Sequence, residues 1–184
     1  MTTLALNGFT SQFSKGGARA NQFEVRLTSP SGVSLTEAAT YSFYIKTASL
    51  PGHTIDEVTV NYRGRILYLD GDRTFDTWTT SVINDTDFKV RNNLEKWMNY
   101  INDVNSNISV GGSAAGDITS YMGQMQVVQF GRGAENEELR SYTLLNCWPT
   151  VIAPIELSWD TRSEIETFDV TWRYTEFTAT GGVE

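Results

Sequence analysis

The chain has 184 residues, of which 40% are hydrophobic and 20% are charged, and its formal net charge at pH 7 is −8. This length allows one domain with a sizeable core, and the composition is that of a folded globular protein rather than a disordered one. The acidic balance argues against stable nucleic-acid binding, because such binding depends on Lys and Arg that neutralise phosphates.

The sequence shows no recognisable targeting signal, and it contains one cysteine. No apolar run is long enough for a membrane helix. Residues 1–20 lack the basic start, apolar segment and cleavage site of a secretory signal, so we expect synthesis in the cytoplasm. The single cysteine, Cys147, excludes an internal disulfide and a cysteine-based zinc site. Its apolar neighbours are typical of a buried thiol.

Alternating apolar and polar residues predict the first strands, which cover residues 21–28, 41–49 and 55–69. Between the first two, residues 29–40 contain proline and glycine and predict a turn and a short loop. Leu50-Pro51-Gly52 should end the second strand. Gly64 marks a hairpin tip or a bulge, so residues 50–70 are expected to form an extended hairpin or loop.

The stretch from Asp70 to Asp103 has the clearest local signals. Asp70-Gly71-Asp72 predicts a tight turn. Residues 74–83 predict a strand with Trp78, Thr80 and Val82 on one face. Residues 86–103 predict the main helix, capped by Asp85 or Thr86. Its apolar stripe, which should pack on a sheet, contains Val90, Leu94, Trp97, Met98 and Ile101.

The rest of the chain predicts four more strands, over residues 121–130, 139–147, 155–159 and 164–177. The remaining predicted segments are a glycine-rich loop over 105–116, a turn over 131–138 and a tail over 178–184. The sequence therefore predicts one domain, 1–184. It should be mainly β, with one flanking α-helix on an antiparallel sandwich or barrel.

A search for catalytic residues selects none. His53, the only histidine, follows a Pro-Gly break, and no local pattern pairs it with Cys147 as a nucleophile and base. Nearby carboxylates have turn, capping or solvated-hairpin explanations, and no feature selects a glycosidase pair; they are Asp70/Asp72, Asp85/Asp87, Glu135/Glu137/Glu138 and Glu164/Glu166. Glycine-rich segments lack the Lys-Ser/Thr of a phosphate loop. We therefore expect no cofactor, no metal and no enzyme activity, but a structural or binding role.

A set of short motifs occurs along the chain in a defined order. The densest part is Gly71 to Trp78, reading GDRTFDTW, followed by Ile83-Asn84-Asp85. The remaining motifs are Asn21 to Val25, Leu50-Pro51-Gly52, Trp148-Pro149-Thr150, Ile155 to Asp160, Glu164-Ile165 and Thr167 to Thr171. Together they resemble the tail tube proteins of contractile-tailed bacteriophages.

The resemblance implies a structural virion protein whose six-subunit rings stack into the inner tail tube. The inner wall would be a barrel of strands shared between neighbours. Expected partners are other copies, the sheath, the tape-measure protein in the lumen, the baseplate hub or initiator and the tail terminator. Double-stranded DNA would pass through the lumen without sticking. Tubes of type VI secretion and phage-like toxin particles share the fold.

Strand phase then suggests which residues face the lumen, namely Thr59, Asn61, Thr167, Asp169 and Thr171. Contacts between subunits and rings are expected on the long hairpin, at Pro51, His53, Asp56, Glu57, Arg63, Arg65, Asp72 and Arg73, with residues 1–20 and the glycine-rich loop as further contact segments. Arg63, Arg65 and Arg173 do not suit a wall that must not bind DNA, unless acids at subunit boundaries pair with them.

Alternatives stay open at this point. Within the superfamily they are a tube initiator, a terminator, or a tube from a secretion or toxin-delivery particle. In a different class, a monomeric β-barrel that binds a small molecule would need an apolar pocket.

Overall fold

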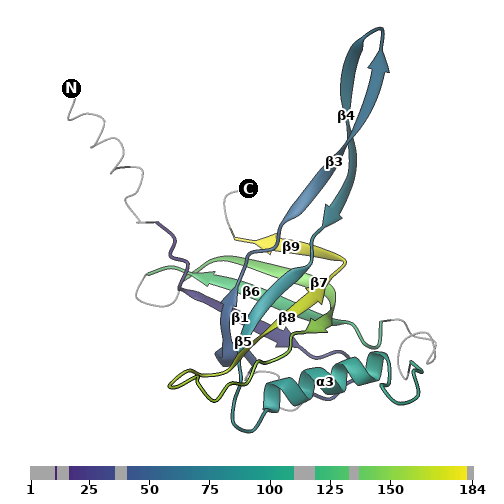
Figure 1. The fold of residues 1–184 in the computed structure, drawn as a ribbon. Coiled ribbons are helices and arrows are strands. Elements are labelled where there is room, and N and C mark those ends of the chain that lie inside the picture. Colours follow the sequence, from purple (N-terminus) through teal and green to yellow (C-terminus); the bar gives the residue numbers. More distant parts are fainter. Residues whose placement is uncertain (1–10, 12–16, 36–40, 110–118, 133–136, 182–184) are drawn as a thin grey trace.

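The computed structural model describes residues 11, 17–35, 41–109, 119–132 and 137–181 (Figure 1). Most of the expected N-terminal arm, residues 110–116 of the glycine-rich loop, residues 133–136 of the expected turn and residues 182–184 lie outside this part of the chain. The strands are β1 (Phe23–Thr28), β2 (Ile45–Ala48), β3 (His53–Tyr62), β4 (Arg65–Phe75), β5 (Trp78–Ile83), β6 (Gly123–Phe130), β7 (Glu138–Ile152), β8 (Thr167–Arg173) and β9 (Glu176–Thr180). The helices are α2 (Tyr41–Tyr44) and α3 (Lys89–Ile101).

The body of the protein is one antiparallel sheet that folds over itself. Its strand order is β1-β6-β7-β8-β5-β2, and β9 also pairs with β7. The 15-residue strand β7 belongs to both layers: its first part pairs with β6 and β9, and its end pairs with β8. Asn146, with φ 54°, lies where the β6–β7 register shifts, so the strand bends there and passes between layers. The expected mainly β, antiparallel fold with one flanking helix is confirmed.

The core between the layers is centred on buried tryptophans, each with a bonded ring nitrogen. Trp172 Nε1 donates to Thr80 Oγ1 at 3.0 Å, and Trp97 Nε1 donates to the Tyr121 carbonyl at 2.8 Å. Trp78 Nε1 donates to the Ser49 carbonyl at 2.6 Å. A buried indole N–H needs a hydrogen-bond partner. These three hydrogen bonds therefore hold the tryptophan rings in defined orientations within the core.

Helix α3 closes one end of the sandwich (Figure 1). Val90, Leu94 and Trp97 of the predicted stripe are buried, while Met98 and Ile101 are half-buried. The predicted helix start was wrong. Phe88 takes a left-handed conformation (φ 53°) and precedes the first helical residue, without a side-chain cap.

Asp85 lies three residues before the cap position and has other partners. Its carbonyl accepts the Phe88 amide at 2.9 Å, which forms a turn before the helix. Its carboxylate accepts the Tyr44 hydroxyl at 3.3 Å.

Three predicted strands differ from the structure. Residues 41–49 begin with the short helix α2, which buries Tyr41, before β2 starts. Residues 155–159 form no strand, since they have no strand neighbour and Trp159 is 101% exposed. Residues 164–177 divide into β8 and β9 around Tyr174, although both pair with β7. The predicted tail at 178–184 begins inside β9.

The predicted turn at Asp70-Gly71-Asp72 was also wrong, because this segment lies inside β4. The partner strand β3 bulges at Asp56, where the register shifts between Ile55 and Glu57. A Cβ on Gly71 would lie 2.7 Å from the Asp56 carbonyl oxygen, so glycine is needed for close approach and not for a reversal. The expected strand over 74–83 is therefore split between β4 and β5.

We predict that Gly123→Ala destabilises the fold. An added Cβ would lie 2.8 Å from the Trp97 ring and 2.9 Å from the Thr28 carbonyl oxygen, so α3 must move away from β6. Overpacking of this kind costs about 2 kcal/mol, which lowers the melting temperature by roughly 4–8 °C in a thermal unfolding experiment. Gly17→Ala is the matched control, since nothing lies within 4 Å of its added Cβ. Equal melting temperatures for the two variants would contradict this packing.

Candidate assembly surface

The most conspicuous surface is a two-stranded arm formed by β3 and β4, which projects away from the body (Figure 1). Strand β3 has 10 residues and β4 has 11, so the arm is about 30 Å long. Arg63 (φ 47°) and Gly64 (φ 82°) form the tip, and two successive positive φ angles match the right-handed twist of a hairpin. The hairpin tip expected at Gly64 is confirmed.

The two faces of the arm differ in polarity. Opposite pairs on one face are Val58–Leu69 and Val60–Leu67, and on the other face they are Glu57–Asp70, Thr59–Tyr68 and Asn61–Ile66. The four aliphatic side chains of the first face, here called the apolar arm face, are 42% to 56% exposed. A lone two-stranded ribbon is marginally stable in water. The arm therefore has both an apolar face and strand edges that another chain can cover.

An aromatic cluster holds the base of the arm against the body. Phe177 of β9 lies at its centre, with ring centroids 5.6 Å from His53, 5.7 Å from Phe75 and 5.9 Å from Tyr142. The Tyr174 hydroxyl donates to the Gly52 carbonyl at 3.2 Å, and burial raises the pKa of this phenol. Packed aromatic rings resist sliding, so the cluster sets the direction of the arm.

The eight expected contact residues all lie on this arm or next to its base. Pro51 and His53 are at the base, and Arg63 and Arg65 are at the tip. The other four lie in the half of the arm nearer the body and are Asp56, Glu57, Asp72 and Arg73.

The five expected lumen residues fall into two separate groups. Thr59 and Asn61 lie on the arm, whereas Thr167, Asp169 and Thr171 share the outer face of β8 in the body. On this face Thr171 pairs with Thr79 of β5, and Asp169 pairs with Ser81. Thr79 and Ser81 share this polar face but were not among the residues expected from the sequence. Their alternation with buried Trp78, Thr80 and Val82 was the available signal.

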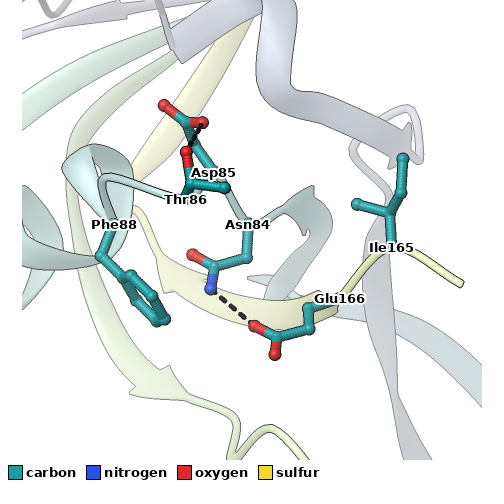
Figure 2. Close-up of a pocket in the computed structure, with 6 residues that line it drawn as sticks. All are labelled: Asn84, Asp85, Thr86, Phe88, Ile165 and Glu166. Atoms are coloured by element: carbon teal, nitrogen blue, oxygen red, sulfur yellow. Dashed lines mark hydrogen bonds between the residues drawn. The ribbon is translucent and has the colours of Figure 1, made fainter. Parts of the chain in front are cut away.

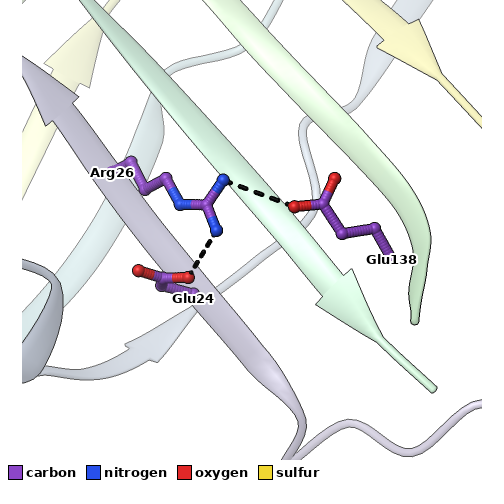
Figure 3. A network of polar contacts seen from close by, with 3 residues as sticks. All are labelled: Glu24, Arg26 and Glu138. Carbon is purple, nitrogen blue, oxygen red and sulfur yellow. Dashed lines mark hydrogen bonds and ion pairs between the residues drawn. The ribbon is translucent and has the colours of Figure 1, made fainter. Parts of the chain in front are cut away.

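On the layer formed by β1, β6 and the first part of β7, the Arg26 side chain is held by two carboxylates (Figure 3). The Arg26 guanidinium contacts Glu24 at 2.9 Å and Glu138 at 3.4 Å, joining β1 to the start of β7. The hydrogen bond to Glu24 is the main cause that raises the pKa of Arg26. This arginine is therefore already paired and is a poor ligand for phosphate.

Residues considered for catalysis are not brought together. Burial raises the pKa of Cys147 to about 12, so the thiol stays protonated near neutral pH. His53 instead packs among aromatic rings at the exposed arm base. Within the described residues, no group of three or more His, Cys, Asp or Glu could hold a metal ion. The helices in that same part are too short or too polar to cross a membrane.

Within the described residues, the chain is thus a β-sandwich body with a long arm whose apolar side chains are exposed, a feature typical of subunits that assemble. Solved structures have the same fold. A chain of the sheath-tube complex of the extracellular contractile injection system PVC aligns with a TM-score of 0.62 at 13% identity, covering 94% of this chain and 98% of that one. The tube terminating cap of the anti-feeding prophage has a TM-score of 0.62 at 16% identity, covering 90% and 92%.

The chain belongs to the phage tail tube protein family, whose model matches residues 18–180. Its relatives include tail tube protein gp19 of Enterobacteria phage T4, 29% identical over 154 residues, covering 84% of this chain and 86% of that protein. The tail tube protein of Serratia phage KSP90 is 26% identical over 172 residues, covering 92% and 93%. The resemblance inferred from the motifs is confirmed, and with it a structural role in the inner tube of a virion tail.

We predict that Phe177→Ala loosens the arm without unfolding the body. The substitution removes the ring that joins His53, Phe75, Tyr142 and Tyr174. Local opening should become easier, and limited proteolysis at the arm base should accelerate by about tenfold. The control is Phe43→Ala, because Phe43 is 83% exposed. If both variants were cleaved at the wild-type rate, the cluster would not be the anchor.

Proposed function

We propose that six copies of this chain form a ring, and that rings stack into the tail tube that conducts double-stranded DNA to the host cell. The observation that carries the proposal is the apolar arm face, which has no cover within the described chain although the arm is anchored firmly at its base. Neighbouring copies can cover it and can also pair with its strand edges. The role is structural, and no enzyme activity is proposed.

The polar outer face of β8 and β5 is the proposed lumen wall. Thr79, Ser81, Thr167 and Thr171 supply hydroxyl groups, and Asp169 adds a negative charge. Such a wall is hydrated and does not attract phosphates, so a duplex can slide along it. Thr59 and Asn61 would extend this polar surface along the arm.

The further partners follow from the family and from what structural neighbours assemble with. The PVC relative comes from a sheath-tube complex, and another neighbour comes from the baseplate of the anti-feeding prophage. We propose a sheath around the tube, a baseplate hub below it, a terminator above it and a tape-measure protein within it before ejection.

A second candidate is a tube or tube initiator of an injection or secretion particle, favoured by the fold shared with that baseplate chain (TM-score 0.63, 9% identity). Negative-stain electron microscopy over a concentration series separates the two. A main tube protein should form long hollow tubes alone, whereas an initiator should stop at single rings. A uniform monomer, also after baseplates are added, would contradict both.

We predict that the double substitution Val60→Asp and Leu67→Asp prevents assembly. It places two carboxylates opposite each other on the apolar arm face, where a neighbour must pack. The concentration needed for rings or tubes should rise by about a hundredfold or more, measured by sedimentation, while the circular dichroism spectrum stays that of wild type. The matched control is Thr59→Asp with Asn61→Asp, which adds the same charge to the polar face. Equal loss of assembly in the control would refute the assignment of the faces.

We also predict that Thr171→Lys makes the lumen retain DNA. Tubes should form at the wild-type concentration, because Thr171 lies on the outer face of β8 and not in the core, but each subunit adds one positive charge to the wall. Short duplexes should then co-sediment with tubes at low salt and dissociate as salt rises. Thr178→Lys on β9 is the control. Equal duplex binding by both variants would place β8 outside the lumen.

A further inference from the structure

The tip end of the apolar arm face carries a positive charge. Tyr62 pairs with Arg65 across the strands, two positions beyond Val60–Leu67, so both side chains lie on this face. Tyr62 is 65% exposed, and the Arg63 guanidinium lies 5.3 Å from the centre of its ring. Neither arginine forms an ion pair within the described residues. The tip therefore presents unpaired cations beside an aromatic ring.

The other end of this face, nearer the body, carries a negative charge. Alternation along β4 places Gly71 on the face, two residues after Leu69. A Cβ on Gly71 would lie 3.4 Å from the Asp56 Cβ, so Asp56 shares this side of the ribbon. Its carboxylate has no ion pair in the described part of the chain. Because Gly71 has no side chain, there is room beside this carboxylate for a long side chain of another molecule.

The two ends complement each other but cannot meet within one chain. They belong to one extended ribbon, and residues 56–62 of β3 span roughly 20 Å (Figure 1). A second copy whose arm runs in the opposite direction removes this separation. The tip of each arm then lies on the base of the other, and the aliphatic side chains of the two faces lie between these ends.

We propose that two free subunits pair face to face through antiparallel arms before assembly begins. Arg65 of each copy enters the space above Gly71 of the other and meets Asp56, to which the Tyr62 hydroxyl also donates. The aliphatic side chains of the two faces cover one another. The pair has two-fold symmetry, so every contact occurs twice. This inference goes beyond the proposed tube, because it concerns the subunit before it joins a ring.

Charge selects the antiparallel orientation. Arms that ran in the same direction would place Arg65 against Arg65 and Asp56 against Asp56, and like charges repel. The rest of the arm has the same polarity. Residues 53–57 and 70–75 contain four carboxylates and one arginine, whereas residues 62–66 contain two arginines and no carboxylate. The tip of one arm is therefore attracted to the base of the other.

A hollow in the body is another acidic place that the tip of a second copy can reach (Figure 2). Its volume is about 340 Å³, and it is lined by Asn84, Asp85, Thr86, Phe88, Ile165 and Glu166. Both of its carboxylates already accept hydrogen bonds, Glu166 from Asn84 at 2.9 Å and Asp85 from the Tyr44 hydroxyl at 3.3 Å. Binding there would also leave the apolar arm face in water. Pairing through the arms covers that face and is favoured for this reason.

The pair is weak enough to reverse. Two ribbons that overlap over about 20 Å, each about 10 Å wide, meet over an area well below the roughly 1,200–2,000 Å² that stable interfaces bury. A dissociation constant of roughly 10–100 μM is therefore expected. Because the pair uses the face that the proposed ring also needs, it must open before assembly. The pair thus limits premature polymerisation.

Sedimentation equilibrium of the full-length chain tests the pair, and the wild type should show a monomer–dimer equilibrium. Asp56→Lys alone and Arg65→Glu alone each place like charges at both ends of the pair. Each should weaken dimerisation about tenfold or more, while thermal unfolding stays that of wild type. A 1:1 mixture of the two variants should recover dimers, because both ends of the mixed pair regain opposite charges.

The matched control is Glu57→Lys, which makes the same change of charge at the next residue but on the opposite face of the arm. It should dimerise like the wild type, and equal weakening by the control would overturn the assigned face. Free wild-type subunits that stay monomeric up to about 1 mM, or up to the concentration at which tubes form, would also overturn the pair. The same holds if the mixture shows no recovery. These outcomes leave the proposed tube intact, whereas dimers without rings or tubes at any concentration, also after baseplates are added, would contradict the proposed function alone.

Discussion

Trp172 is the residue on which the body of this protein depends. From β8 its ring packs on Trp97 of α3, with centroids 5.7 Å apart, and edge-on against Tyr41 of α2 at 6.2 Å. Its ring nitrogen donates to Thr80 of β5. One side chain therefore fixes the helix, the short helical turn and the neighbouring strand at once. A rigid body follows, and a rigid body is what allows a slender arm to be aimed at another subunit.

The arm follows a different physical rule from the body. The body buries its apolar side chains between two layers, but a two-stranded ribbon has no second layer and leaves both faces in solvent. Its exposed apolar surface would be a liability in a monomer. In the proposed tube the same surface would drive assembly, and the aromatic cluster around Phe177 would limit the entropy lost when another subunit covers the arm. Anchoring at the base and exposure along the arm thus serve the same assembly.

The sequence predicted most of the body, because alternation and helical spacing report burial directly. Trp78, Thr80 and Val82 on β5 and the stripe of α3 are examples. It failed where a tertiary partner decided the outcome. The sequence around Gly71 predicts a turn. In the structure, glycine is needed at this position because the backbone of Asp56 passes close to it. Residues 155–159 alternate like a strand but have no strand to pair with. The hairpin pattern correctly placed the expected contact residues on one hairpin. Thr79 and Ser81 share the polar face of β8 and β5 but were not named from the sequence, because only the buried face of their strand was considered.

In the proposed tube, the positions of the arginines would limit how strongly the subunits hold DNA. Arg26 is neutralised by two carboxylates on the layer opposite β8. Arg63 and Arg65, which do not suit a lumen wall, lie at the arm tip and not on the outer face of β8 and β5. Arg173 remains on the polar face, on the same side of β8 as Asp169, because side chains at every second position of a strand point to the same side. Because Arg173 and Asp169 carry opposite charges, this face of β8 has no net charge. At physiological salt the screening length is about 8 Å, so the remaining electric field is weak at a distant phosphate. In the proposed tube, hydroxyl groups would therefore line most of the surface along which DNA moves.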